Sequence, residues 1–360
     1  MRPQVLILGG QGRIGYSIAC DVLRHTDAQV TVTGRRAAPS PPGLITRTLD
    51  LADAPSLQTA IAASDLVIHC AGPFHNRNGR VLESCIAQGV NYLDVSDCVP
   101  FTRRALAQHK AAQDKGVTAI INTGVFPGIS NSMVRQCVEA FDAVEDTPQE
   151  IFLGYVVGGS GGAGVTVMRT TFLGLLQPFS AWVNGQWQPR WPYRDRQVVD
   201  FPEPFGPIGV YWYEVPETYT LADTFDVDTV VTKFGSAPDL YNRLTGIVAR
   251  WCPKPLLKQP ATIEFLSRVS YGMTQVSDRW SGTGIGIWAE VGGKAQRYRS
   301  TLVYDDTAIA AGVGTGSLVA LLLAGELNQP GVYPVEQALP TPLFERTLHQ
   351  RGLQTTHGWS

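Results

Sequence analysis

The sequence predicts an α/β protein in which a doubly wound parallel sheet is followed by a second α+β domain, built on a largely antiparallel sheet. In the first third of the chain, short apolar runs alternate with helix-like segments, a rhythm typical of a parallel sheet covered on both faces. Beyond residue 150, segments rich in Thr, Val, Tyr and Trp lie between Pro and Gly, as antiparallel strands do. At 360 residues the chain is long enough for two domains.

The elements of the first domain follow in order. We expect strands at residues 5–8, 29–33, 66–70, 92–95 and 119–122, and a further strand that ends at Asp50-Leu51. Helices are expected over 14–25, 56–63, 81–88 and 101–115. This gives six strands by about residue 123. Pro127 and Gly128 then interrupt the chain, and the next helix is expected to begin near Asn131.

The second half predicts strands at residues 151–157, 227–234, 262–269, 284–291 and 297–304. After residue 306 the chain becomes helical and apolar. The stretch 308–325 contains several Gly, Thr and Ser residues, which favours a buried helix over a membrane span. We therefore expect a nucleotide-binding domain over 1–130, a substrate or dimerisation domain over 131–305, and a segment over 306–360 that returns to the first domain.

Composition excludes several classes of partner. The formal net charge of −2 offers no electrostatic basis for binding nucleic acid or an anionic membrane, so a small molecule is the expected partner. The six cysteines have neither metal-ligand nor disulfide-framework spacing, and no metal site is predicted. Cysteine usage and the absence of a signal-peptide core favour a cytoplasmic protein.

A glycine motif follows the first expected strand and opens the first helix. Gly10 would make the tight turn, Gly12 would let backbone amides approach a pyrophosphate, and Gly15 would allow close packing of helix on strand. This context predicts a Rossmann-type dinucleotide site, the alternative being a purely structural turn. The motif reads Gly10-Gln11-Gly12-Arg13-Ile14-Gly15.

The end of the second strand indicates which dinucleotide binds. NAD enzymes usually place an acid there for the ribose 2′-hydroxyl, but this chain has Gly34-Arg35-Arg36. Two guanidiniums suit a 2′-phosphate, so the prediction is NADP(H). The alternative is an ordinary solvated arginine pair.

Other strand ends supply further cofactor contacts. The dinucleotide should cross the carboxyl edge of the sheet beside the residues that follow the fourth strand. The fifth and sixth strands should end near the nicotinamide. For Asp50 and Leu51, contact with adenine and an ordinary loop role remain equal alternatives. The remaining candidates are Cys70, Ala71, Gly72, Pro73, Ser96, Asn122 and Gly124.

Three side chains are candidates for chemistry on the substrate. Asp97 could carry a proton or could cap the following helix. His75 could enter the site or lie on the surface, whereas His69 is expected to be a satisfied core residue. Arg169 could bind a substrate carboxylate or be a solvated helix residue.

Several segments resemble the saccharopine dehydrogenase-like oxidoreductases. The resemblance lies in Ala71-Gly72-Pro73-Phe74, in residues 79–94 with Cys85 and Gly89, and in the closing segments 321–326, 330–333 and 351–353. It implies a Rossmann domain interrupted by a substrate domain and completed by the C-terminal helix. It also implies hydride transfer between NADP(H) and a carbonyl, imine or enoyl group.

Two functional hypotheses remain open from sequence. One is an NADPH-dependent reductase in which Asp97 or a bound water handles the proton; the other is a non-catalytic NADP(H)-binding sensor or assembly protein. The Tyr-x-x-x-Lys pair of short-chain dehydrogenases is absent, since no lysine has a tyrosine four positions before it. By analogy of fold, an exposed face of the antiparallel sheet is expected to be buried in a homodimer.

Overall fold

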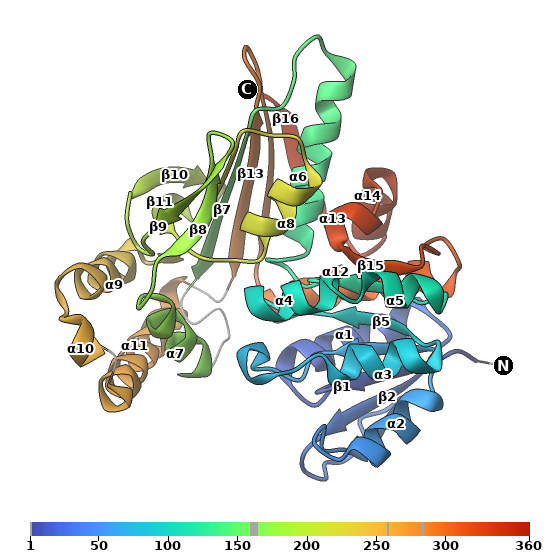
Figure 1. Ribbon diagram of the computed structural model, residues 1–360. Helices are drawn as coiled ribbons and strands as arrows, with labels where there is room; N and C mark the ends of the chain where they lie inside the picture. The colour runs from blue at the N-terminus through green and yellow to red at the C-terminus, as the bar shows by residue number, and fades with distance from the viewer. Residues whose placement is uncertain (1, 159–164, 258, 282–283) are drawn as a thin grey trace. The chain divides into compact units, whose positions relative to one another are not determined.

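The computed structural model describes residues 2–158, 165–257, 259–281 and 284–360. By its internal contacts the chain divides into two units, shown with their elements in Figure 1. The first unit comprises residues 1–132 and 308–354, and the second comprises residues 133–307 and 355–360. Each unit is organised around its own seven-stranded sheet.

The first unit has a parallel sheet in the order β15-β6-β5-β4-β1-β2-β3. Its strand order reverses beside β1, because β2 pairs on one side of β1 and β4 on the other. Dinucleotides bind at such a reversal, outside the carboxyl ends of the strands. The strands are β1 (Gln4–Leu8), β2 (Gln29–Gly34), β3 (Leu44–Thr48), β4 (Leu66–His69), β5 (Asn91–Asp94), β6 (Thr118–Ile121) and β15 (Gly331–Pro334).

Helices cover both faces of this parallel sheet. On one face, α2 (Ala54–Ala62) and α3 (Arg80–Gln88) contribute Leu57, Ile61, Leu82 and Ile86 to a core with the strand residues, and α4 (Val99–Leu106) and α5 (His109–Asp114) extend it. Elsewhere α1 (Arg13–His25) is approached closely by α12 (Thr307–Leu323), where Gly312 lies against the backbone of Ser17. The short α13 (Val335–Ala338) and α14 (Thr341–Gln350) complete the unit.

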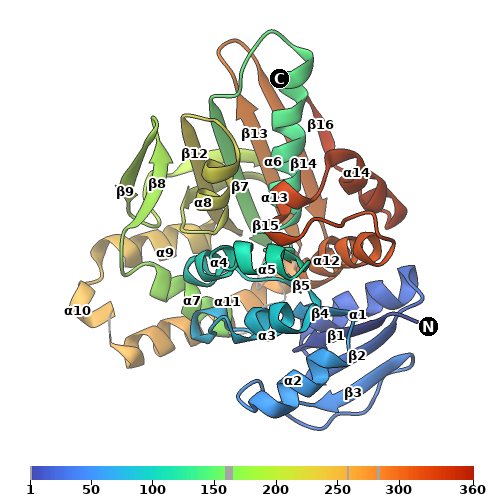
Figure 2. The ribbon, with the colours of Figure 1, turned by 45° about the vertical axis from the view of Figure 1, so that its right-hand side comes forward.

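The second unit has a mixed sheet in the order β10-β11-β12-β7-β13-β14-β16, in which only the β7–β12 pair is parallel. Both views place α6 (Ile129–Glu139) and α8 (Glu217–Thr224) over one face of this sheet (Figures 1 and 2). The strands are β7 (Glu150–Gly158), β10 (Gln197–Phe201), β11 (Gly206–Trp212), β12 (Thr229–Ala237), β13 (Ile285–Gly292), β14 (Arg297–Tyr304) and β16 (Thr356–Trp359).

The remaining elements of the second unit are a hairpin and a group of helices. The hairpin joins β8 (Phe179–Val183) to β9 (Gln186–Arg190). The helices are α7 (Val165–Gly174), α9 (Asp239–Trp251), α10 (Lys254–Leu257) and α11 (Pro260–Ser281). Short 3₁₀ turns lie at Phe74–Asn76 in the first unit and Ala140–Ala143 in the second.

The structure corrects several expected elements. Residues 262–269 form part of α11 rather than a strand, because Ile263, Ser267 and Thr274 repeat at helical spacing and are buried together. Residues 101–115 form α4 and α5, and β15 adds a strand that the sequence did not predict. Residues 355–360 belong to the second unit, because β16 pairs with β14.

The apolar stretch after residue 306 forms α12, most of whose residues are buried. Of the helices that the structure describes, none is both long enough and apolar enough to cross a bilayer.

Candidate functional site

The loop between β1 and α1 is packed so tightly that larger side chains are excluded. A Cβ on Gly10 would lie 2.7 Å from Val32 Cβ, and one on Gly15 would lie 2.6 Å from the Gly9 carbonyl oxygen. The positive φ of 80° belongs to Gly9, not to Gly10, so the tight turn falls one residue earlier than the sequence suggested. The packing roles inferred for these glycines are otherwise those of a dinucleotide loop.

The first turn of α1 presents backbone amides at this loop. Gly12 is the N-cap residue and provides no side-chain cap, and the first helical bond runs from the Tyr16 amide to the Gly12 carbonyl oxygen at 2.8 Å. The amides before Tyr16 therefore lack a helical carbonyl partner, and the helix dipole adds partial positive charge there. Such an end suits a phosphate group.

The end of β2 carries two cations beside this loop. Arg35 and Arg36 are exposed, and neither has an ion-pair partner among the residues that the structure describes. A Cβ on Gly34 would lie 2.0 Å from Gln11 Oε1, so a larger residue at position 34 would have to displace the Gln11 side chain. Gln11 of the glycine loop thus packs against the residue that precedes the two arginines.

Neighbouring strand ends bring a second loop against the first. Leu8 pairs with His69, and a Cβ on Gly9 would lie 2.8 Å from the Ala71 backbone. The loop of Cys70, Ala71, Gly72 and Pro73 therefore touches the glycine turn, at the place where a dinucleotide would cross the sheet edge. Burial raises the pKa of the Cys70 thiol, so this cysteine stays protonated.

Arg77 fixes the conformation of that second loop. Its Nε donates to the Ala71 carbonyl oxygen at 2.7 Å and its Nη2 to that of Gly72 at 3.2 Å. Arg104 in turn donates to the Arg77 carbonyl oxygen at 2.8 Å. Sequence analysis did not identify Arg77, since an isolated arginine in a loop carries no recognisable motif.

The ends of β5 and β6 hold a buried polar network. Asp94 Oδ1 accepts the amides of Ser96 at 3.0 Å and Asn122 at 3.1 Å, and Asn122 Nδ2 donates to the Ser96 carbonyl oxygen at 2.7 Å. Burial raises the pKa of Asp94 to about 6, although these two amides lower it. The side chains of Ser96 and Asn122 are fully buried, and their hydrogen bonds inside the protein hold the loops that follow β5 and β6.

Asn122 adopts a left-handed backbone conformation, with φ at 60°. Asparagine tolerates this region better than most residues because its short side chain bonds locally. Here the side chain also donates to Thr102 Oγ1 at 2.9 Å, which ties β6 to α4. At Gly124 the approaching element is α12, where a Cβ on Gly314 would lie 2.6 Å from the Gly124 carbonyl oxygen.

His69 lies in the same interior. It is fully buried among Phe74, Tyr92 and Phe101, and its Nδ1 lies 3.3 Å from the Tyr92 hydroxyl. Burial lowers its pKa to about 3, so the imidazole is neutral at physiological pH. As expected, His69 is a core residue.

Asp97 and His75 lie on loops of the same unit. Asp97 does not cap α4, because Cys98 is the N-cap residue and Ser96 Oγ accepts the Cys98 amide at 3.2 Å. The Asp97 side chain has solvent access, and partial desolvation raises its pKa while the charge of His75 opposes this. His75 lies in the 3₁₀ turn after the Gly72-Pro73 loop and is also exposed.

Arg169 has a partner inside the second unit. It lies on α7, and its guanidinium forms an ion pair with Glu264 of α11, whose carboxylate also pairs with Arg268 at 2.8 Å. Its charge is therefore largely balanced within the protein.

Asp50 and Leu51 follow β3 in a turn. Asp50 Oδ1 accepts the Ala52 amide at 3.0 Å, and Leu51 packs against the core of the first unit. These contacts favour a structural role for both residues.

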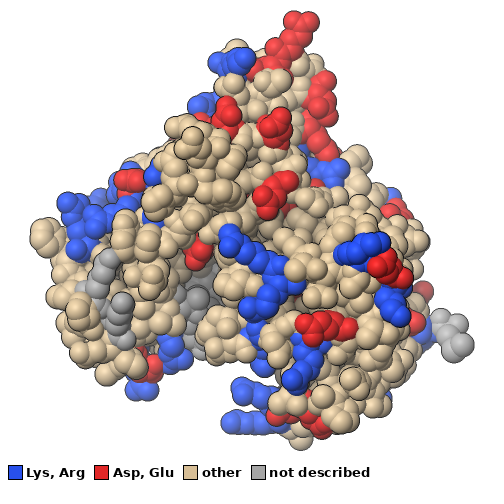
Figure 3. All heavy atoms as spheres, viewed as in Figure 1, with Lys and Arg blue, Asp and Glu red and all other residues tan. Residues whose placement is uncertain are grey.

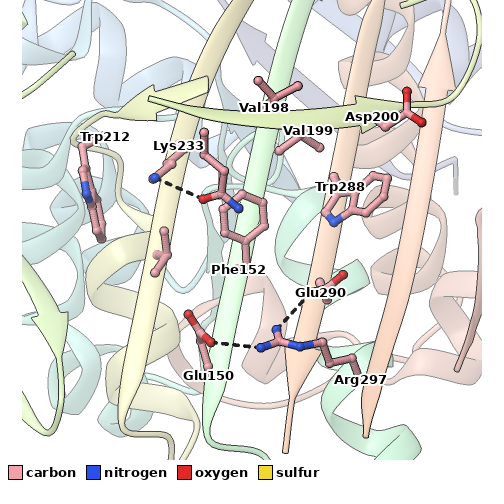
Figure 4. Close-up of a pocket in the computed structure, with 12 residues that line it drawn as sticks. Glu150, Phe152, Val198, Val199, Asp200, Trp212, Lys233, Trp288, Glu290 and Arg297 are labelled. Atoms are coloured by element: carbon pink, nitrogen blue, oxygen red, sulfur yellow. Dashed lines mark hydrogen bonds and ion pairs between the residues drawn. The ribbon is translucent and has the colours of Figure 1, made fainter. Parts of the chain in front are cut away.

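The open face of the second sheet carries a cavity of about 450 Å³ (Figure 4). Lys233 donates there to Gln197 Oε1 at 3.1 Å, and Arg297 pairs with Glu290 at 3.1 Å and Glu150 at 3.7 Å. The strand β10 crosses in front with Val198 and Val199. Arg297 is thus paired with carboxylates, whereas the Lys233 ammonium donates to neutral oxygen atoms of Gln197 and Asp195 and keeps its charge in the cavity.

Within the described ranges no group of three or more His, Cys, Asp or Glu side chains could hold a metal ion.

Comparison with known proteins adds the family. Residues 5–120 match the saccharopine dehydrogenase NADP binding domain. The chain is 27% identical to carboxynorspermidine synthase of Vibrio cholerae over 328 residues, which cover 82% of this chain and 77% of that protein. It is 32% identical over 82 residues to a probable mitochondrial saccharopine dehydrogenase-like oxidoreductase of Arabidopsis thaliana, covering 22% of this chain and 18% of that one.

Among solved structures, apo saccharopine dehydrogenase (L-Glu forming) from Saccharomyces cerevisiae has the same fold. The TM-score is 0.70 at 15% identity, with 99% of this chain and 100% of that chain covered.

Proposed function

We propose that this chain is a saccharopine dehydrogenase-like oxidoreductase, an enzyme that transfers hydride between NADP(H) and a carbonyl, imine or enoyl substrate. The single observation that supports this most is the conjunction of the glycine loop at α1 with two exposed arginines at the end of β2. This conjunction provides a phosphate cradle and a cationic site for a second phosphate.

The residues present fit NADP(H). The first turn of α1 would hold the pyrophosphate, with Gly12 leaving the backbone uncovered, and Arg35 and Arg36 would pair with the 2′-phosphate. The loop from Cys70 to Pro73, held by Arg77, would border the dinucleotide where it crosses the sheet edge. When bound, the nicotinamide supplies or accepts the hydride.

An imine is the substrate class we favour among the three. The relative from Vibrio cholerae is named for making carboxynorspermidine, by its name a carboxylated amine. Reduction of an imine is a direct route to such an amine. An imine needs a proton on nitrogen as well as hydride on carbon, and the solvent-accessible Asp97, with its raised pKa, is the group we assign to this transfer.

His75 and Arg169 have subsidiary roles in this proposal. The charge of His75 lowers the pKa of Asp97, so His75 would tune the acid rather than react itself. Arg169 would meet a substrate carboxylate only by sharing its pairing with Glu264.

We further propose that the enzyme works in the cytoplasm as a homodimer. None of the six cysteines forms a disulfide in the structure, which fits a reducing compartment.

Titration of the purified protein with NADPH and with NADH tests the cofactor assignment. Arg35→Ala should weaken NADPH binding about 10- to 100-fold, the loss of a charged hydrogen bond, and should leave NADH binding within a few-fold. Arg2→Ala is the matched control, because Arg2 is also exposed but precedes β1 and so lies at the opposite edge of the sheet.

A screen of carbonyl, imine and enoyl compounds for NADPH oxidation then tests the chemistry. Turnover that Asp97→Asn reduces supports the enzyme. Equal losses of NADPH and NADH affinity in Arg35→Ala would contradict the 2′-phosphate assignment. Tight NADPH binding without turnover of any compound would instead favour the sensor, the second candidate.

A further inference from the structure

Helix α9 of the second unit has two apolar faces, and only one is covered. On its inner face Asn242 is fully buried, and a Cβ on Gly246 would lie 3.8 Å from the Tyr211 ring. The other face carries a row of large side chains at positions i, i+4, i+7 and i+11, which lie one above another on a helix. These are Leu240, Leu244, Ile247 and Trp251, which are 58%, 40%, 55% and 74% exposed.

The neighbouring helix α11 repeats this pattern. Phe265, Val269 and Val276 are exposed at the same spacing, with Gly272 at the remaining position. The Tyr241 hydroxyl of α9 donates to the Met273 carbonyl oxygen of α11 at 2.8 Å, so the two helices are in contact. Together with Leu256 of α10, the exposed side chains of both rows are here named the α9–α11 patch.

Two carboxylates beside the patch each bind two arginines, Asp239 with Arg196 and Arg243, and Glu264 with Arg169 and Arg268. Arg243 pairs with Asp239 at 3.1 Å, and Arg268 pairs with Glu264 at 2.8 Å. In Figure 3 the side that carries α9 to α11 is largely tan, with blue atoms at its margin. Helices that lie on anionic membranes present Lys and Arg without such partners around their apolar face. The four arginines here are all bonded to carboxylates, which favours a protein partner.

The spacing on α9 is the same in both directions. Intervals of four, three and four residues place Leu240 and Trp251 symmetrically about the point between Thr245 and Gly246, and Leu244 and Ile247 likewise. A two-fold axis at that point would align two antiparallel copies of α9, with Leu244 against the partner's Ile247 and Leu240 against the partner's Trp251.

The exposed area is also sufficient. The eight large side chains of the patch, at on the order of 100 Å² each, supply the roughly 800 Å² per partner that a standard interface buries. Patches above a few hundred Å² are uncommon on monomers.

We propose that the α9–α11 patch is a docking surface for a second copy of this chain, with the two α9 helices antiparallel across a two-fold axis. This differs from the dimer expected from fold analogy, which would bury the open face of the second sheet. The proposal is independent of the enzymatic activity.

Sedimentation equilibrium on matched variants distinguishes the two surfaces. Leu244→Glu/Ile247→Glu should weaken the dimer at least 100-fold, because four carboxylates would meet at the axis. Val198→Glu is the control, since Val198 is 54% exposed over the cavity of the second sheet. It should leave the dimer unchanged. NADPH binding and circular dichroism verify that each variant is folded.

The opposite result, with association lost in Val198→Glu and kept in Leu244→Glu/Ile247→Glu, would overturn the proposal. So would a wild-type chain that stays monomeric at every concentration. If such a monomer floats with vesicles containing anionic lipid, the patch serves a membrane instead.

The antiparallel pairing has its own test. Leu244→Glu/Ile247→Lys places a glutamate against a lysine twice across the axis, whereas the double glutamate variant places like charges there. The Glu/Lys protein should associate at least 10-fold more tightly than the Glu/Glu protein, and added salt should reduce the difference. Equal association constants would rule out this pairing.

Discussion

Both units bury ionisable side chains, Glu217 of the second among them, but the second unit also exposes a row of large apolar ones. The first unit buries ionisable side chains, among them Asp94, His69 and the Asp21–Arg351 pair. The second unit leaves a row of large apolar side chains on α9 exposed. Apolar surface and buried polar groups are both costly unless something compensates. We infer that the first unit compensates internally, through hydrogen bonds that shape its loops, and the second externally, through a partner.

Their helices show the same contrast. Helix α12 of the first unit uses Gly312, Gly314 and Gly316 to approach α1 and the loop after β6, where added Cβ atoms would lie 2.0 to 2.9 Å from their nearest neighbours. On α9 the large side chains point away from the unit's core. Three comparisons of matched variants test whether these differences have the energies that we assign to them.

The largest effect is expected from the buried ion pair of the first unit. Arg351 Nε donates to both carboxylate oxygens of Asp21 at 3.0 Å, and the two side chains are only 2% and 8% exposed. Arg351→Met should lower the free energy of unfolding by about 3–5 kcal/mol, because it leaves the buried Asp21 carboxylate with the more distant His25 Nε2, 3.9 Å away, in place of the guanidinium. Urea denaturation measures this loss.

Arg346→Met is the matched control, since Arg346 pairs with Glu326 where both side chains are about 40% exposed. That change should cost about 1 kcal/mol or less. Equal losses in the two variants would mean that burial of the Asp21–Arg351 pair has no energetic consequence.

The second effect concerns pH. Folding raises the pKa of Asp94 to about 6 from an unfolded value near 3.8, so the folded state binds this proton more tightly. The contribution of the Asp94 carboxyl group to the free energy of unfolding therefore falls as the pH rises from about 4 to about 6. Above about pH 6 this contribution is constant. Asp94→Asn removes that dependence.

The unfolding free energy of Asp94→Asn minus that of the wild type should rise by up to about 3 kcal/mol between about pH 4 and pH 7. Asp50→Asn, at an exposed carboxylate of the same unit, is the control. If the unfolding free energy of Asp94→Asn minus that of the wild type does not change between pH 4 and pH 7, burial does not raise the pKa of Asp94 in the folded protein.

The smallest effects compare one glycine from each unit. A Cβ on Gly312 would lie 2.9 Å from the Ser17 backbone, so Gly312→Ala should cost about 1–3 kcal/mol. On α9, the nearest atom to a Cβ on Gly246 is 3.8 Å away, and Gly246→Ala should gain about 0.5–1 kcal/mol. Thermal denaturation of the two variants would show shifts of opposite sign. A shift of the same sign in both would contradict the difference in packing.

The parts of the molecule set by local sequence were predictable. The glycine loop, the arginines after β2 and the core position of His69 follow from neighbouring residues, and the α/β class with its two kinds of sheet follows from periodicity. The family comparison confirms NADP(H) binding. Residues 262–269 were wrongly predicted as a strand, because Ile263, Phe265 and Val269 also suit a strand.

Features that depend on distant contacts were not predictable. Arg77 acts on carbonyl groups five and six residues away through a turn, and Asp94 is a network centre only because β5 lies beside β6. The strand β15 is four residues long and pairs with a strand far earlier in the chain. Asp97 looked like a helix cap because Asp often occupies that position, but α4 begins one residue later than a cap at Asp97 requires.

The discontinuity of the first unit affects the order of events during synthesis. Its sheet is completed when β15 pairs with β6, and Gly331 follows Ile121 by 210 positions. At about 5–20 residues per second, the ribosome takes on the order of 10–40 s to cover that distance. During this interval β6 has an unpaired edge and the surface that α12 will cover is open to water. The nascent chain must therefore keep its first domain unfinished until nearly all of it has been made.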